Sequence, residues 1–187
     1  MAISNNNTGI RTGVCTSTTR PTAPYEGQHI YETDTDKVLV WNGSAWKQIP
    51  TAATAGTVLQ TIYGSSTTQV PNAGTAYVDA GISATITPQA TTNKILVIAT
   101  TPIYMADSDC NVFVRVLRSA TEISLSIQND STSANAHQSS SMVVLDSPST
   151  TSATTYKIQW KNNNAAKTSY VMNNGQFGSI ILQEIAG

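Results

Sequence analysis

Short stretches with the two-residue alternation of β-strands recur along most of this chain, and turn-forming Gly, Asn, Asp, Ser and Pro residues separate them. From residue 58 onward the stretches are spaced about 8 to 15 residues apart, which is typical of β-sandwiches and jelly rolls. No segment has the apolar periodicity of an amphipathic helix, so the crossover helices of a parallel βαβ sheet are excluded. The pattern therefore predicts an all-β fold with antiparallel sheets.

Composition agrees with this prediction and limits the function. Charged residues make up only 11% of the chain, against about 25% in an average soluble protein. Hydrophobic residues reach 40%, which is enough for a core and excludes a fully disordered chain. The net charge is −1 at pH 7 and no basic stripe is present, so we expect no nucleic-acid binding.

Changes in composition along the chain predict four parts. The first 24 residues are polar, carry Gly and Pro breakers and show no sustained period, so we expect an extended arm that is either floppy in isolation or ordered by docking on another protein. The parts are an extended arm (1–24), a small β-meander (25–50), a linker (51–57) and an antiparallel, jelly-roll-like β-sandwich (58–187).

The meander is predicted from three strand-like segments, 28–32, 37–41 and 45–49. Between the second and third segments lies Asn42-Gly43, the strongest two-residue signal for a tight hairpin turn. A turn of this kind requires a positive φ at Gly43. We therefore expect a compact three-stranded module.

Three aromatic residues are expected to form the packing nucleus of this module, namely Tyr31, Trp41 and Trp46. A meander of this size is only marginally stable by itself. We therefore expect it to pack on a partner, on another copy or on the C-terminal domain.

Two predicted strands of the C-terminal domain are apolar on both faces, 95–98 and 180–182. A strand in an antiparallel sandwich normally has one wet face. A subunit interface would cover the second face and predicts a homotrimer; central strands under loops are the alternative. The predicted strands of this domain are 58–63, 76–80, 83–87, 94–100, 111–118, 122–128, 141–145, 155–161, 168–172 and 178–185.

Residues that carry chemistry are sparse. His29 and His137 have no second His or Cys at ligand spacing, and no catalytic motif is present. We therefore expect no enzyme, no catalytic residue, no metal and no cofactor. Cys15 and Cys110 are expected to be free thiols, with pairing left open.

Four aromatic residues remain as candidates for sugar stacking, Tyr104, Tyr156, Trp160 and Tyr170. Their alternative role is packing in the core or in an interface, which is commoner for aromatic residues in strands. The N-terminus lacks the features of a signal peptide. The longest apolar run, Ile95 to Ala99, is far shorter than the ~20 residues of a membrane span, so we expect cytoplasmic synthesis without membrane insertion.

The segment from Thr16 to Trp46 resembles a module of virion proteins from tailed bacteriophages, notably those of marine and cyanobacterial hosts. Its motifs are R-P-x-x-P-x-E-G-Q from Arg20, I-Y-E-T-D-T from Ile30 and W-x-G-S-x-W from Trp41. The C-terminal domain is similar, more loosely, to phage fibre tips. The matching features there are Ile86-Thr87-Pro88 before Lys94–Val97, Leu145–Pro148 with Ser149–Thr151, and the ending Ile180–Ile185.

The resemblance implies a structural virion protein, synthesised in the host cytoplasm, that forms a short homotrimeric fibre or tail appendage. Its N-terminus would face the particle and its β domain would point outward and contribute to binding of host-surface glycan. Two alternatives stay open: a capsid decoration or head-fibre protein that stabilises the particle, and, from another class, a free carbohydrate-binding lectin.

Overall fold

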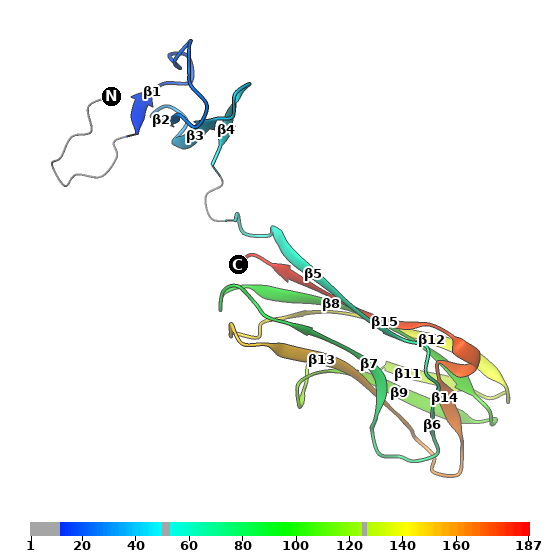
Figure 1. Ribbon diagram of the computed structural model, residues 1–187. Coiled ribbons are helices and arrows are strands. Elements are labelled where there is room, and N and C mark those ends of the chain that lie inside the picture. The colour runs from blue at the N-terminus through cyan, green and yellow to red at the C-terminus, as the bar shows by residue number, and fades with distance from the viewer. Residues whose placement is uncertain (1–11, 50–52, 125–126) are drawn as a thin grey trace. The chain divides into compact units, whose positions relative to one another are not determined.

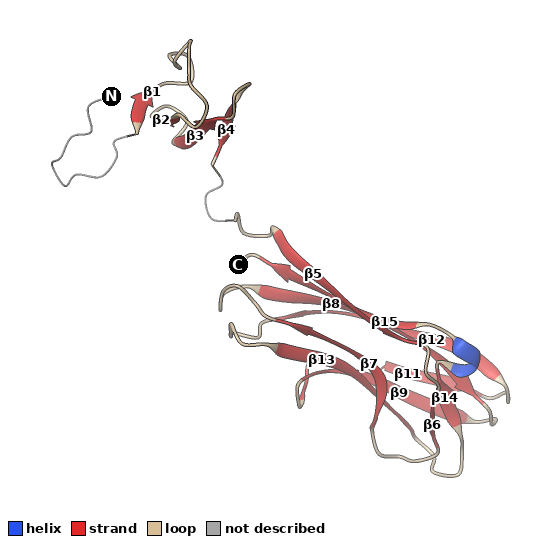
Figure 2. Cartoon of the chain, viewed as in Figure 1, coloured by secondary structure: helices blue, strands red, loops and turns tan. Residues whose placement is uncertain are grey.

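The computed structural model describes residues 12–49, 53–124 and 127–187, and the chain divides into two compact units, Met1–Ala52 and Ala53–Gly187. The division falls within the predicted linker. Both units are built from β-strands (Figures 1 and 2), and in the described ranges the one helical element is a 3-10 turn, η1, at Asn173–Gly175. The predicted all-β fold is confirmed.

The N-terminal unit is a four-stranded sheet in the order β1-β2-β3-β4, with one strand more than predicted. Its strands are β1 (Gly13–Cys15), β2 (His29–Glu32), β3 (Lys37–Trp41) and β4 (Trp46–Gln48). β1 pairs in parallel with β2, whereas the other neighbours are antiparallel. The prediction of an extended arm over 1–24 is therefore wrong for β1, because a three-residue strand is too short to show alternation; residues 1–11 lie outside the described residues.

One face of this sheet holds the buried side chains of the unit. Ile30 and Leu39 lie opposite each other in register and are almost fully buried. Trp41 and Trp46 are also in register and pack edge to face, with ring centroids 5.6 Å apart. Tyr31 points to the opposite face, because side chains alternate along a strand, and its hydroxyl donates to Asp36. The expected cluster of three aromatic residues is therefore a pair.

The turn between β3 and β4 is longer than the two residues predicted. Trp41 pairs with Trp46, so the loop contains four residues, from Asn42 to Ala45. Asn42 Oδ1 accepts hydrogen bonds from the backbone N–H of Ser44 at 3.1 Å and of Ala45 at 2.9 Å. Gly43 has φ +91°, which is the positive value that the sequence predicted.

The C-terminal unit is an antiparallel β-sandwich of two sheets (Figure 1). In one sheet β10, β9, β13 and β7 follow one another and β11 also pairs with β9; in the other the order is β5-β15-β8-β14-β6 and β12 also pairs with β8. The strands are β5 (Val58–Ser66), β6 (Val70–Asn72), β7 (Val78–Ile86), β8 (Lys94–Met105), β9 (Cys110–Arg118), β10 (Thr121–Glu122), β11 (Ile127–Ser131), β12 (Ala136–Asp146), β13 (Thr154–Asn162), β14 (Ser169–Val171) and β15 (Gly178–Ile185).

The strand pattern differs from the prediction in three places. The two segments expected at 76–80 and 83–87 form one strand, β7, which continues through Gly81 at φ +74°. The segment expected at 122–128 contributes to two strands, β10 and β11. β6 was not predicted, because its three residues include a proline, which is confined to edge strands or bulges.

The core lies between the two sheets and consists of the inward-facing residues of each long strand. Trp160 and Tyr156 are its largest fully buried side chains. The sheets approach each other closely where β5 meets β7. A Cβ atom at Gly64 would overlap the carbonyl oxygen of Ser83 and lie 2.9 Å from its carbonyl carbon, so this approach requires glycine.

Candidate functional site

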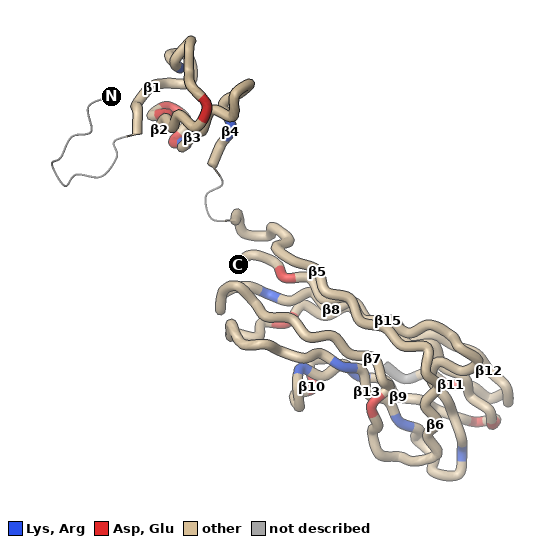
Figure 3. The backbone as a smooth tube through the Cα atoms, in the orientation of Figure 1, with Lys and Arg blue, Asp and Glu red and all other residues tan. Residues whose placement is uncertain are grey.

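The outward face of the five-stranded sheet is charged and internally hydrogen-bonded. Arg115 donates to Gln159 and to Glu122, each at 2.7 Å, and Lys157 donates to Asp79 at 3.0 Å. Figure 3 shows Lys and Arg gathered along β13 and β9. This face has the character of a solvated surface.

The outward face of the six-stranded sheet has the opposite character. Four apolar side chains lie in direct register across β5, β15, β8 and β12: Tyr63, Ile181, Ile98 and Val143. They point outward because their neighbours along each strand fill the core. Tyr63 is 54% exposed and Val143 is 69% exposed, so the described residues of the C-terminal unit leave the ends of the row uncovered.

The row continues on both sides into a contiguous patch. Leu96 and Leu145 form a second in-register pair on β8 and β12, and the ring of Phe177 stacks on Tyr63 with centroids 6.3 Å apart. Leu145 and Phe177 are also more than half exposed. We call the set of Tyr63, Leu96, Ile98, Val143, Leu145, Phe177 and Ile181 the apolar outer face.

This face is almost without charge. The four strands that carry it contain three charged residues, Lys94, Asp146 and Glu184. Asp146 is bound by Arg118 and by the Tyr156 hydroxyl, and Glu184 is fully buried. Among the described residues of these four strands, Lys94, at the first position of β8, is therefore the one charge beside the patch.

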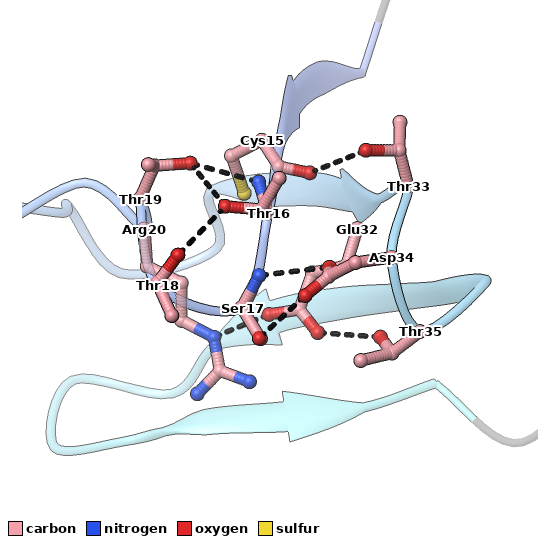
Figure 4. Close-up of polar contacts among 10 residues, drawn as sticks. All are labelled: Cys15, Thr16, Ser17, Thr18, Thr19, Arg20, Glu32, Thr33, Asp34 and Thr35. Carbon is pink, nitrogen blue, oxygen red and sulfur yellow. Dashed lines mark hydrogen bonds and ion pairs between the residues drawn. The ribbon is translucent and has the colours of Figure 1, made fainter.

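A polar corner in the N-terminal unit holds a buried carboxylate (Figure 4). The side chain of Glu32 is fully buried, accepts a hydrogen bond from the Arg20 guanidinium and accepts another from Thr35 Oγ1 at 2.7 Å. These donors, with Arg20 the stronger, lower the pKa of Glu32. The backbone N–H and hydroxyl of Ser17 bind Asp34 at 2.8 and 2.6 Å, and the pKa of Asp34 is lowered for that reason.

The polar corner holds residues 15–20 against the sheet. Thr33 donates its backbone N–H to the carbonyl of Cys15 at 3.0 Å. The pKa of the Cys15 thiol is raised by burial and by the charge of Glu32, so the thiol is a poor nucleophile. The corner is thus a structural clamp, and residues 16–20 of the expected extended arm form one side of it.

Two of the four predicted sugar-stacking residues are in the core. Tyr156 and Trp160 are fully buried, so the prediction that they present open ring faces is wrong. Burial and the hydrogen bond to Asp146 raise the pKa of Tyr156. Their alternation with Lys157 and Lys161 on β13 is the sequence signal for this burial, since the charged residues need the wet face.

The other two candidates lie together on the surface. Tyr104 and Tyr170 are in register on β8 and β14, with ring centroids 5.8 Å apart, and His137 on β12 lies 4.8 Å from Tyr104 on its other side. The rings lean on one another, so the faces of Tyr104 are partly covered. His137 is exposed and lies beside Tyr104 through the pairing of β12 with β8, which its sequence position does not reveal. We call Tyr170, Tyr104 and His137 the ring row.

Metal and redox sites are not formed by the residues that the structure describes. Within them, no group of three or more His, Cys, Asp and Glu side chains is placed to hold a metal ion. Cys15 and Cys110 are free thiols in separate units. No helix in the described ranges is long and apolar enough to cross a membrane.

No protein-family model matches the sequence, and no curated protein is significantly similar to it. Among solved structures, the infectious bursal disease virus Gx strain matches with a TM-score of 0.43 and 9% identity over 81% of this chain and 42% of that chain. The VP2 subviral particle of the same virus matches with a TM-score of 0.38 and 9% identity, over 90% and 46%. The chain thus spans less than half of these chains, and TM-scores this low establish no common fold.

Proposed function

We propose that this protein is a structural component of a tailed-bacteriophage virion, a short homotrimeric fibre or tail appendage. The observation that carries the proposal is the apolar outer face on the six-stranded sheet. Contiguous apolar surface of this kind marks an interaction site on a soluble protein. A chain with such a surface is suited to assembly.

The N-terminal unit supplies the link to the particle. It carries the motifs that resemble phage virion modules, at Arg20, Ile30 and Trp41. The outward face of its sheet also exposes apolar side chains, with Val14 70% exposed and in register with Tyr31. We place the contact with other virion proteins here, rather than on an extended arm.

The described structure favours a short appendage over a long fibre. β5 begins at Val58, ten residues after the end of β4 at Gln48, so no repetitive shaft separates the two units. The proposal includes no catalytic step, metal or cofactor. A contribution to host-surface glycan binding is assigned to the ring row of Tyr170, Tyr104 and His137.

The test is immunogold microscopy of native particles with an antibody raised against this protein. Label at the tail or neck supports the proposal, and label spread over the capsid replaces it with a decoration or head-fibre role. Particles without label, together with free protein that binds glycan, would establish a lectin instead. Mass spectrometry of purified particles provides an independent measure of the same outcome.

A further inference from the structure

We infer that the apolar outer face is the contact between copies of this chain and that its occupant is the same face of the other copies, brought together around a threefold axis. The inference rests on the proposed function, because it names the surface through which the homotrimer would form. It follows from the area, the charge and the residue pattern of the face.

The area is sufficient for the central part of a stable interface. Four strands about 4.8 Å apart, rising about 3.3 Å per residue over roughly eight paired residues, offer on the order of 500 Å² of flat surface per copy. A standard interface buries about 800 Å² per partner, which includes a polar rim. The loops around Phe177 and the ends of β12 would supply the rim.

The charge of the face selects a neutral partner. Lys94 is the one charge beside the patch, as described above, so a nucleic acid or a strongly acidic or basic protein would lose hydration without gaining ion pairs. The outer face of the other sheet carries Arg115 and Lys157 in hydrogen bonds and Lys161 over the ring of Tyr77, and is unsuited to this role. A second copy always presents a neutral apolar surface of matching size.

The residue pattern of the face is that of a sandwich interior. Outward-facing Ile98 and Ile181 are paired across β8 and β15, and Thr100, Ser141 and Ser179 form a small-residue row beside them. Apolar rows bordered by small residues allow two sheets to pack about 10 Å apart. Three such faces that meet around a threefold axis would complete the second buried side of β8 and β15.

The experiment measures the mass of the full chain in solution by light scattering coupled to size exclusion. We expect wild type to elute at about three times the 19.8 kDa chain mass at tens of micromolar. Val143→Asp places a charge at the edge of the apolar row and should weaken association by at least tenfold. Ser83→Asp is the matched control, because it adds the same charge to an exposed site on the opposite sheet, and its mass should equal that of wild type.

Folding of each variant is checked by its circular dichroism spectrum, and Tyr63→Ser at the other edge of the row provides a second variant if Val143→Asp does not fold. A wild-type protein that stays at 19.8 kDa, or folded variants of the row that associate as wild type does, would overturn the inference. If the chain is monomeric in solution but the antibody still labels virions, this interface is refuted and the proposed virion role stands. If the chain associates in solution but is absent from virions, the interface stands and the proposed virion role is refuted.

Discussion

The Arg20 guanidinium binds the fully buried carboxylate of Glu32 and thereby ties residues that look like a free polar arm to the second strand of a sheet. The two residues are 12 positions apart. A buried carboxylate has a high desolvation cost unless it is paired. The pair therefore offsets this cost and stabilises the N-terminal unit.

Removal of Arg20 should loosen the clamp. In Arg20→Ala, Glu32 keeps its buried position but loses its charged partner, so we expect residues 13–20 to exchange their backbone amide hydrogens faster. Lys47→Ala, at an exposed site on β4, is the control and should leave exchange unchanged. Equal protection in Arg20→Ala and wild type would show that the ion pair does not hold β1.

Acid should weaken the N-terminal unit. The pKa values of Glu32 and Asp34 are lowered from ordinary values of 4.5 and 3.8. A lowered folded-state pKa stabilises the fold above the unfolded-state value, and this stabilisation is lost as pH falls through the folded-state value. We expect faster amide exchange in residues 13–20 only below about pH 4, after correction for the intrinsic rate. Compared with wild type, Asp34→Asn should show faster exchange at pH 7 and a smaller change on acidification. A pH profile identical to that of wild type would contradict the assignment of the acid sensitivity to Asp34.

Gly64→Ala should destabilise the sandwich strongly. The added Cβ would overlap the Ser83 carbonyl and force β5 away from β7, and overpacking of this kind costs roughly 1–3 kcal/mol or more. Gly13→Ala is a control in the other unit, since its Cβ would meet no atom closer than 3.7 Å. Urea unfolding monitored through the buried Trp160 tests the first change, and an unaltered midpoint would mean that the two sheets can separate locally without cost.

Gly43→Val should destabilise the N-terminal unit. A β-branched residue at φ +91° is strained by roughly 1–3 kcal/mol, and the turn would no longer hold Trp41 against Trp46. Near-ultraviolet circular dichroism reports the packing of these two rings. Gly43→Asn is the control, because Asn tolerates positive φ, and it should keep most of the signal. If both variants give the wild-type spectrum, the turn does not position the tryptophans.

Glycan binding, if it is located at the ring row, should depend on its exposed members. We expect Tyr170→Ala and His137→Ala to reduce binding to a glycan array at least tenfold, because each ring lost removes contact area for the sugar. Thr85→Ala, on the exposed face of the other sheet, is the matched control. Wild-type binding by both ring variants would place the glycan site elsewhere, and no binding by wild type would remove glycan recognition from the proposed function.

Local patterns in the sequence were sufficient to predict the all-β class, most strands of both units and the positive φ of Gly43. They also identified segments 95–98 and 180–182 as apolar on both faces. These features depend on neighbouring residues, because alternation and turn chemistry act over a few positions. The three-residue strand β1 and the proline-containing β6 are too short for such a signal.

The tertiary structure alone decided which of these segments meet. Pairing of β8 with β15 aligns Ile98 with Ile181, and pairing of β8 with β12 adds Val143, so that separate apolar residues become one surface. The same long-range pairing brings His137 beside Tyr104. The sequence determines the period of each strand, whereas the order and register of strands follow from how two sheets bury their apolar faces together, and that is a property of the whole fold.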